Sequence, residues 1–481
     1  MLMRKDGNLI EVVQRRLERK DVSEQALIQC LASWSANLSV TQLDADVTHA
    51  ATRAIVDTVG VMMAGANKPL SQRVARMIEE DCQPGHATMF TGGTSRKPTG
   101  AAFANGVAAH VLDFDDTCYD GILHASCVIL PAVLACAEEA DATTADILAA
   151  FVAGSEVTYA LGRALTDVFW GGWWTTATLG SIGAAAGAAR ALDLGEARSA
   201  HAMAIAISLT FGTRTLLGTD TNPIGAGTAA QAGVRAALLA RAGASGPLSA
   251  IEHPIGLAAV FNRGVLDRQK MSQIGQYYGL RDSGIAFKAY PACSGTQAAC
   301  QAVQELLGRH HFKAQDVKTV TCRVSPLVAE NLRYSNPSNL TEAQFSLPFA
   351  IGCLLKYGEF SVRQLKDEVL KAPELRAEVA KVTMLRADDI VGADDVDRYP
   401  EAAAITVEFH DGRRIDHKVL AARGMPSDPL SDIELRDKFM NCAIELVPSA
   451  LAESIYDSLW QLDRGGYARE LFADLRARLA E

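Results

Sequence analysis

The segment "TADILAAFVAGSEVTYALGRAL" (residues 144–165) indicates the fold class most clearly. Its apolar residues recur at three- and four-residue spacing, which is typical of a helix that buries one face. Many of its residues are alanine, glycine or serine, so neighbouring helix axes can approach closely. The same pattern recurs in "EQALIQCLASWSANL" (24–38), "ATRAIVDTVGVMMAGA" (51–66) and "GTAAQAGVRAALLARAGA" (227–244). Residues 23–280 are therefore predicted to form helix after helix.

The pattern changes near residue 285, where β-branched residues begin to alternate along the chain. Strands are predicted in "VKTVTCRVSP" (317–326), "VAKVTMLRA" (379–387) and "ITVEFHDGRRIDHKV" (405–419), the last with a hairpin turn at "HDGRR". The helical period returns after about residue 425. A chain of 481 residues is too long for one average domain. We expect a mainly α fold: a large all-helical domain made of residues 1–285 and 421–481, with a smaller α/β lid domain, residues 286–420, inserted.

Composition limits the partners and the compartment. The net charge of −10 disfavours nucleic acid as a partner, because nucleic-acid binding needs a basic face. The N-terminal stretch "MLMRKDGNLIEVVQRRLERKD" is charged and lacks an apolar core, so it is not expected to be a signal peptide. Ten cysteines without a C-x-x-C pair suit reduced thiols rather than disulfides or a zinc framework. We expect a cytoplasmic protein.

One charge-free segment, Val168 to Ala189, is long enough to span a membrane. It is built from glycine, alanine, serine and threonine rather than leucine, isoleucine and valine. We interpret it as a buried, closely packed helix preceded by an aromatic loop, and expect no membrane partner.

The stretch "HVLDFDDTCYDGILH" (110–124) concentrates acidic residues between apolar neighbours. "DFDDT" fits a phosphoryl-accepting D-x-D-x-T motif, but that motif follows a buried strand, and here helices are predicted on both sides. It also fits the D-x-D-D-T proton donor of terpene cyclases, whose cavities are rich in aromatic residues. A metal cage would need further oxygen ligands. A structural alternative is a helix end that Asp116 or Thr117 caps. These residues alone leave the alternatives open.

The neighbouring motifs carry a family resemblance. "NGVAAHVLDFDDT" and "HASCVILPAVLACAEE", followed by "TTATLGSIGAAAGAARALDLG", "GTAAQAGVRAALLARAGASGP", "FKAYPACSG" and "FSLPFAIGCLLKYG", resemble the MmgE/PrpD family over most of the chain and in the right order. That family includes 2-methylcitrate dehydratase, cis-aconitate decarboxylase and iminodisuccinate epimerase. The resemblance implies a helical domain with an α/β lid, a homodimer, and no metal or organic cofactor.

The resemblance also implies roles for individual residues. Asp113, Thr117 and His124 match positions that line the family's active site, and Lys288 matches a site lysine. Lys288 is expected to pair with a substrate carboxylate and Thr117 to hydrogen-bond one. His124 is expected to be the main proton-transfer group, with Asp113 fixing its tautomer or acting as a base. Tyr290 is a further candidate for proton transfer.

Several positions depart from the family pattern. Trp174 stands where a histidine is frequent, and Asn222 stands where a lysine is expected. Phe349 replaces a tyrosine, Gln297 a late histidine, and Cys293 a histidine that some decarboxylases carry. The pocket should therefore be more apolar and less positive than that of a tricarboxylate dehydratase. The expected substrate-binding residues are Asp116, Thr117, Trp174, Asn222, Cys293, Gln297 and Phe349.

The resemblance favours a cofactor-independent lyase of the dehydratase or decarboxylase type, similar to 2-methylcitrate dehydratase. It would act on a small di- or tricarboxylic acid by removing a proton next to a carboxylate. An epimerase of an amino- or imino-dicarboxylate is the alternative, because epimerisation needs fewer charged groups. A non-catalytic binding protein is the third hypothesis. We expect the site in a cleft between the two predicted domains, where ligand sites are frequent.

Overall fold

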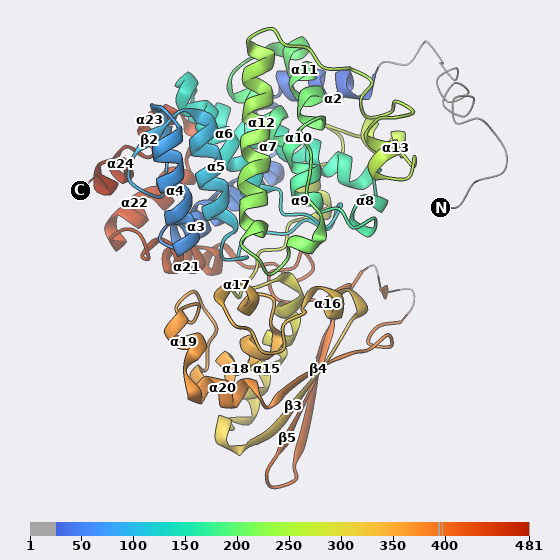
Figure 1. Ribbon diagram of the computed structural model, residues 1–481, viewed down its shortest axis with the longest axis vertical. Coiled ribbons are helices and arrows are strands. Elements are labelled where there is room, and N and C mark those ends of the chain that lie inside the picture. The colour runs from blue at the N-terminus through green and yellow to red at the C-terminus, as the bar shows by residue number, and fades with distance from the viewer. Residues whose placement is uncertain (1–25, 393–394, 397, 481) are drawn as a thin grey trace, which may run out of the picture.

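The computed structural model describes residues 26–392, 395–396 and 398–480. Residues 1–25 lie outside the described residues. They include the N-terminal stretch that was not expected to be a signal peptide and the start of the predicted first domain. Figure 1 shows two bodies, one above the other. The upper one is made of helices and is called the helical body here. The lower one combines helices with a β-sheet and is called the sheet body.

The helical body contains helices from both ends of the chain. Figure 1 shows α21–α24 beside α3–α5, so the C-terminal residues return to the N-terminal helices. The first group comprises α2 (Leu27–Asn37), α3 (Ala45–Ala66), α4 (Pro69–Asp81), α5 (Pro98–His110), α6 (Ser126–Ala140), α7 (Thr144–Ala164), α8 (Asp167–Trp170), α9 (Thr175–Thr178), α10 (Gly180–Ala191), α11 (Gly195–Ile207), α12 (Thr221–Arg241), α13 (Leu257–Phe261) and α14 (Arg268–Ser272). The second comprises α21 (Asp432–Ala443), α22 (Ser449–Leu459), α23 (Ala468–Leu471) and α24 (Ala473–Leu479). The prediction of a mainly α fold is confirmed.

Helix α7 is one of the long buried helices of this body. It begins at a capping box in which the Thr143 and Asp146 side chains satisfy each other's backbone N–H groups. By length and composition α7 could span a membrane, but 89% of its most apolar window is buried inside the protein. Its apolar residues are therefore accounted for by packing. The charge-free segment after it is also buried for the most part, but it forms three helices, α8 to α10, instead of one.

Small residues bring α7 and α10 together, as expected. A Cβ atom built on Gly183 of α10 would lie 1.9 Å from Thr158 Oγ1 and 2.5 Å from the Gly154 carbonyl oxygen, both in α7. Real side chains do not approach so closely, so only glycine fits at this crossing.

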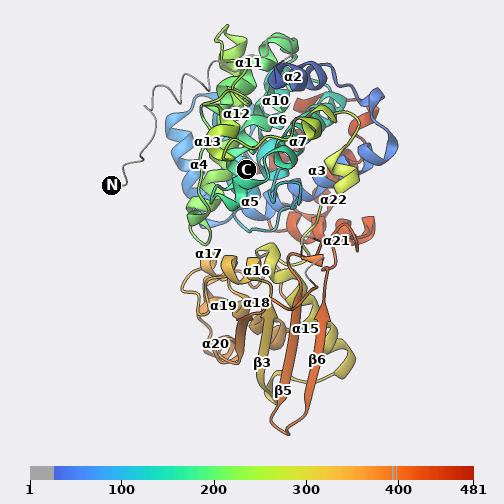
Figure 2. The same ribbon diagram turned by 90° about the vertical axis from the view of Figure 1, so that its right-hand side faces the viewer.

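The sheet body contains a four-stranded mixed sheet in the order β4-β3-β5-β6. Its strands are β3 (Val317–Val324), β4 (Val382–Arg386), β5 (Ala403–Phe409) and β6 (Arg414–Val419), and its helices are α15 (Gln297–His310), α16 (Pro326–Asn331), α17 (Leu340–Ala343), α18 (Leu347–Tyr357), α19 (Asp367–Lys371) and α20 (Pro373–Val379). β4 runs parallel to β3, and the other pairs are antiparallel. The predicted hairpin is present as β5 and β6. Figure 2 shows the strands extending away from the helical body.

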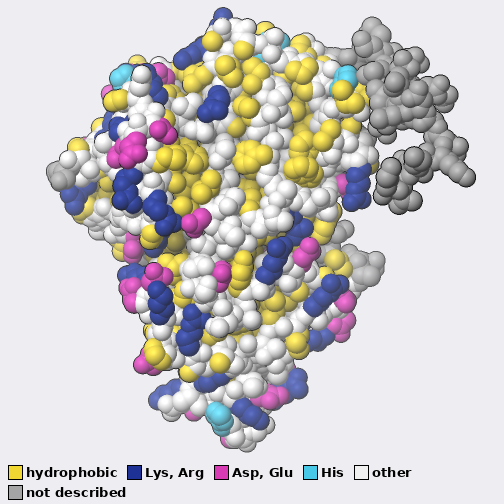
Figure 3. All heavy atoms as spheres, viewed as in Figure 1, with side chains coloured by type: hydrophobic (Ala, Val, Ile, Leu, Met, Phe, Trp, Pro, Cys, Tyr) yellow, Lys and Arg dark blue, Asp and Glu magenta, His cyan; other side chains and the backbone are white. Residues whose placement is uncertain are grey.

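A short hairpin that the sequence did not reveal, β1 (Pro84–Thr88) with β2 (Ser95–Arg96), lies in the helical body. Figure 3 shows hydrophobic side chains gathered on the front of the helical body, whereas charged side chains are spread over the sheet body.

Each body has its own hydrophobic core, and the acidic loop lies where the cores meet. The core of the sheet body includes Leu112 and Phe114 of that loop and Val61 of α3. Conversely, Phe287, which leads into the sheet body, packs in the core of the helical body. The backbone of residues 110–124 is therefore held between two packed bodies rather than exposed.

We predict that Gly183→Ala destabilises the protein by about 1–3 kcal/mol, because the added methyl group forces α7 and α10 apart. The matched control is Gly308→Ala in α15, where a Cβ atom meets nothing within 4 Å. Alanine is the better helix former, so this control should be neutral or stabilising by up to about 1 kcal/mol. Urea unfolding of both variants measures the difference. Equal stability of the two variants would contradict the close helix crossing.

Candidate active site

The loop between α5 and α6 reverses direction at Asp113, whose φ of 46° lies in the left-handed region that non-glycine residues rarely adopt. Lys288 holds this turn from the segment before α15. Its Nζ donates a 2.9 Å hydrogen bond to the Asp113 carbonyl oxygen and forms an ion pair with the Asp113 carboxylate. Both side chains are buried. Burial alone would lower the pKa of Lys288, but Asp113 and Asp115 raise it, so the lysine stays charged.

Two further contacts fix the loop. Thr117 and Ala286 exchange backbone hydrogen bonds of 2.9 and 2.8 Å. Lys438 of α21 donates to the Phe114 carbonyl oxygen at 2.9 Å and pairs with Asp57 of α3 at 2.7 Å. The loop is thus bound to two separate parts of the chain, residues 286–288 and helix α21.

His124 closes the loop as a neutral imidazole. Its Nδ1 lies 2.7 Å from the Asp116 carbonyl oxygen and 3.2 Å from Thr117 Oγ1. A carbonyl only accepts, so Nδ1 carries the proton and Nε2 keeps a lone pair. Burial, and then the charge of Lys288, lower the pKa of His124 to about 4. Asp113 was expected to fix this tautomer, but the Asp116 carbonyl does so, because the Asp113 carboxylate is engaged by Lys288.

The pKa of His110, at the end of α5, is shifted in the opposite direction. Its Nδ1 lies 2.9 Å from both carboxylate oxygens of Asp115. Burial disfavours the charged ring, but Asp115 outweighs it and raises the pKa of His110. Burial likewise opposes the ionisation of Asp115, yet the charges of His110 and His124 hold its pKa well below the usual range. His110 and Asp115 therefore form a buried ion pair.

The two imidazoles are neighbours. The His110 and His124 ring centroids are 5.2 Å apart, and the Trp174 ring lies 5.4 Å from His110 on the other side. When the environment shifts the pKa values of two adjacent groups apart, one group can donate a proton while its neighbour accepts one. His110 and Asp115 were not among the predicted site residues, although both lie inside the acidic stretch 110–124.

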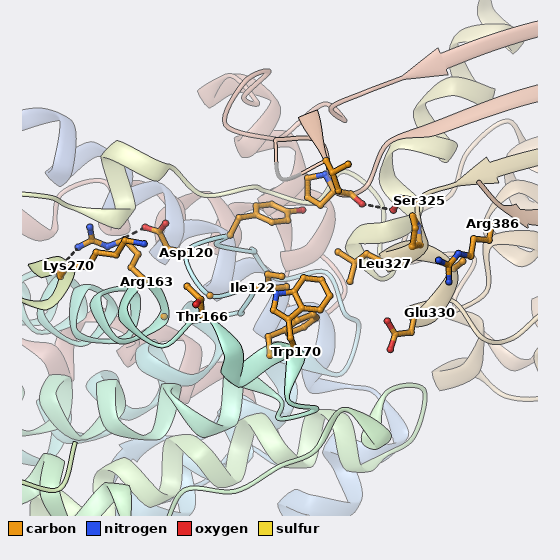
Figure 4. Close-up of a pocket in the computed structure, with 18 residues that line it drawn as sticks. Asp120, Ile122, Arg163, Thr166, Trp170, Lys270, Ser325, Leu327, Glu330 and Arg386 are labelled. Atoms are coloured by element: carbon orange, nitrogen blue, oxygen red, sulfur yellow. Dashed lines mark hydrogen bonds and ion pairs between the residues drawn. The ribbon is translucent and has the colours of Figure 1, made fainter. Parts of the chain in front are cut away.

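These groups line a cavity of about 40 Å³ between the two bodies. That volume holds no more than a few water molecules, so a substrate must widen it. The cavity is lined by His110, Asp113, Thr117, Ile122, His124, Phe169, Trp174, Arg214, Leu217, Asn222, Cys293, Ser294, Leu327, Asn331, Phe345 and Glu401. A larger outer pocket shares Ile122, Phe169 and Leu327 with it (Figure 4).

Two buried polar atoms of the lining residues have no partner among the described residues. They are Nε of Arg214 and Oδ1 of Asn222. The Arg214 guanidinium is otherwise held over the Phe169 ring at 4.0 Å, by Asn331 at 2.8 Å and by the Glu330 carboxylate at 3.8 Å. Buried polar atoms are nearly always satisfied, so unpaired ones in a cavity wall fit a bound ligand. Arg214 can bind a carboxylate, and Asn222 Oδ1 can accept from a hydroxyl or a protonated carboxyl. No motif in the sequence indicated Arg214.

Glu401, immediately before the β5 region, was also missed. It accepts hydrogen bonds of 2.6 Å from the Tyr119 hydroxyl and from Ser294 Oγ. Burial raises the pKa of Glu401. The contact joins the acidic loop of the helical body to the sheet body across the cavity.

Some predicted site residues lie outside the cavity wall. Gln297 Oε1 accepts from the backbone N–H of Tyr290 at 3.0 Å and so shapes the turn after Lys288. The Tyr290 hydroxyl instead donates to Gln304. Phe349 is fully buried against Phe360, as a core residue. Of the expected residues, those in the cavity wall are Asp113, Thr117, His124, Trp174, Asn222 and Cys293.

His110, Asp115 and Cys127 could in principle hold a metal ion, because their ligand atoms lie within 4.8 Å of one another. A cysteine binds metal as a thiolate. Burial and Asp115 raise the pKa of Cys127 well above the usual range, which favours the thiol, and its sulfur donates to the His124 carbonyl oxygen at 3.3 Å. These three residues fit a hydrogen-bonded cluster better than a metal site.

The buried carboxyl group of Asp116 allows the electrostatics of the loop to be tested through the pH dependence of stability. Its carboxyl group accepts from Ser126 Oγ through one oxygen, whereas the other has no partner among the described residues. Burial raises the pKa of Asp116 to about 8. Because the folded pKa exceeds the unfolded one, the stabilising contribution is complete below about pH 4 and is lost as pH rises toward 8.

We predict that the wild-type free energy of unfolding falls, relative to that of Asp116→Asn, between pH 5 and pH 8. The difference in unfolding free energy between the two proteins should change by at most about 1.4 kcal/mol per pH unit, because one unit of pKa shift corresponds to that free energy. Urea unfolding at several pH values measures this difference. The contributions of other buried acids cancel in the comparison because both proteins contain them. A difference that stays constant with pH would mean that Asp116 is ionised in the folded protein.

Comparisons with known proteins identify the family of the chain. The model of the MmgE/PrpD N-terminal domain matches residues 29–269, and that of the MmgE/PrpD C-terminal domain matches residues 290–462. Similar proteins include the cis-aconitate decarboxylases of Homo sapiens (27% identical, 90% of each chain covered) and Mus musculus (26%, 91% of each). Another is the cis-aconitate decarboxylase-like protein oryM of Aspergillus oryzae (23% identical, covering 93% of this chain and 97% of oryM). The chain belongs to the MmgE/PrpD family, as a divergent member.

Proposed function

We propose that this protein is a cofactor-independent lyase that acts on a small di- or tricarboxylic acid, with decarboxylation as its favoured reaction. The observation that carries the proposal is the pair of adjacent imidazoles in the wall of a buried cavity, where the pKa of His110 is raised and that of His124 is lowered. Lyase chemistry next to a carboxylate needs a group that gives a proton and, for some leaving groups, one that takes a proton. The relatives named as cis-aconitate decarboxylases support this class.

The proposed binding mode uses the unpaired polar atoms. Arg214 holds one substrate carboxylate, and Asn222 holds a hydroxyl or a protonated carboxyl group. Lys288 is buried behind Asp113 and does not line the cavity, so we assign it a positioning role. It fixes the loop, and its charge adds to the effect of burial in lowering the pKa of His124.

Decarboxylation needs one proton donor. The bond from carbon to the departing carboxylate breaks, carbon dioxide leaves, and the electron pair stays on carbon, stabilised by conjugation with a neighbouring carboxyl group. The His110 imidazolium then donates its Nε2 proton to that carbon, and solvent restores it. The wall residues Trp174, Leu217 and Phe345 favour the step, because an apolar surface disfavours the charged carboxylate relative to neutral carbon dioxide.

Dehydration is the second candidate, and the neutral state of His124 favours it. Its Nε2 lone pair can take the proton next to a carboxylate, while His110 protonates the leaving hydroxyl group. Epimerisation has less support. It needs groups on opposite faces of one carbon, whereas these rings lie 5.2 Å apart and leave no room for a substrate between them.

The test is proton NMR of the purified protein in deuterated water with three substrates: cis-aconitate, a 2-hydroxy tricarboxylate and an amino dicarboxylate. We expect loss of carbon dioxide from the unsaturated acid, with one solvent deuterium on the product. Deuterium exchange with inversion and no new alkene would establish the epimerase instead. Neither exchange nor turnover with any acid would favour a binding protein.

Two variants separate the candidate reactions. We predict that His110→Asn lowers kcat by on the order of a hundredfold or more for either reaction, because both use this donor. His124→Asn should have an effect of that size on dehydration and a much smaller one on decarboxylation. Steady-state assays measure both, with melting temperatures to confirm folding. Near-normal turnover of His110→Asn would remove His110 from the chemistry.

Asp115→Asn tests the charge of His110 without removing the ring. Asp115 raises the pKa of His110, so its loss should lower that pKa. Activity that needs the imidazolium disappears as pH rises through this pKa. The alkaline limb of the kcat profile should therefore move to lower pH in the variant. An unchanged limb together with reduced kcat would indicate a purely structural role for Asp115.

A further inference from the structure

The outer pocket is far larger than the cavity that holds the histidines. It encloses about 880 Å³, against about 40 Å³ for the inner cavity, and the two share wall residues. Pockets of roughly 300–1,000 Å³ suit drug-sized ligands rather than an acid of a few carbon atoms. A small dicarboxylate bound at Arg214 would leave most of the outer pocket filled with water.

The middle of the outer pocket is apolar and aromatic. Figure 4 shows Ile122 of the acidic loop, Trp170 of α8 and Leu327 of α16 facing one another across it. Trp170 is 57% exposed, although Phe169 packs edge-on against it at 5.2 Å. A large aromatic face left open to a pocket is typical of surfaces that bind apolar groups.

The charged groups at the ends of the pocket already have partners. Arg163 lies 3.8 Å from the Asp120 carboxylate and 3.7 Å from the Tyr277 ring centroid. Arg386 pairs with Asp388 at 3.0 Å. Lys270 lies 4.0 Å from the Asp267 carboxylate, and Arg163 Nε has no hydrogen-bond partner among the described residues. These charges lie at the ends of the pocket, so we assign the recognition of an apolar group to its aromatic middle.

We propose that the substrate is a carboxylic acid with an aryl or branched apolar substituent. Its carboxylate end lies in the inner cavity at Arg214, and the substituent lies in the outer pocket against Trp170 and Leu327. This inference rests on the proposed function for the location of the reacting carbon. It explains why the inner cavity, which has few cations, adjoins a large outer pocket with an apolar, aromatic middle.

Isothermal titration with 2-phenylsuccinate and with succinate tests the pocket without any turnover. We expect the phenyl compound to bind the wild-type protein at least tenfold more tightly. Trp170→Ala should abolish that difference. Tyr467→Ala, which removes another exposed aromatic residue outside the pocket, should preserve it. Equal affinity of the two acids, or a difference that Trp170→Ala leaves intact, would overturn the proposal.

Turnover provides the second readout. With aryl-substituted and unsubstituted unsaturated diacids, Trp170→Ala should lower kcat/KM at least tenfold more for the first than for the second. Equal effects on both would overturn the assignment. Preferential binding of 2-phenylsuccinate without turnover of any acid would refute the lyase but retain the pocket. A smaller assembly in size-exclusion chromatography with unaltered binding would assign Trp170 to a contact between copies instead.

Discussion

The buried ion pair between Lys288 and Asp113 is the interaction on which the rest of the site depends. It joins the acidic loop to the segment entering the sheet body, and it stabilises a left-handed turn that an aspartate would otherwise avoid. Removing one partner of such a pair leaves a buried charge uncompensated, which costs several kcal/mol. The lysine charge also lowers the pKa of His124. Loop geometry and proton affinity therefore have the same physical origin.

The two histidines of the site differ in their proton affinity. The carboxylate of Asp115 keeps His110 charged, while burial and Lys288 keep His124 neutral. Trp174, at a position where the resembled family frequently has a histidine, packs against His110 and adds apolar surface instead of a third titrating group. The cavity is thereby poor in cations, and Arg214 is the wall residue with an unpaired guanidinium nitrogen. These features favour an acid with few carboxylates and an apolar remainder.

Sequence patterns predicted what depends on local periodicity and missed what depends on long-range contacts. The helices and the β5–β6 hairpin follow from spacing and turn residues, because those are local properties. Arg214 and Glu401 could not be found this way, since each is a single charged residue that becomes a site residue only through folding. Phe349 and Gln297 match family site positions, yet one packs in the core and the other shapes a turn. A side chain that replaces a family residue can be packed or hydrogen-bonded by its neighbours without lining the cavity.

Everything proposed for the site requires the two neighbouring imidazoles to hold opposite charge states. Nitrogen-15 NMR of histidine-labelled protein, assigned with the His110→Asn and His124→Asn variants, measures this directly at pH 7. We predict that His124 is neutral with its proton on Nδ1, and that both nitrogens of His110 are protonated. A charged His124, or a neutral His110, would contradict it.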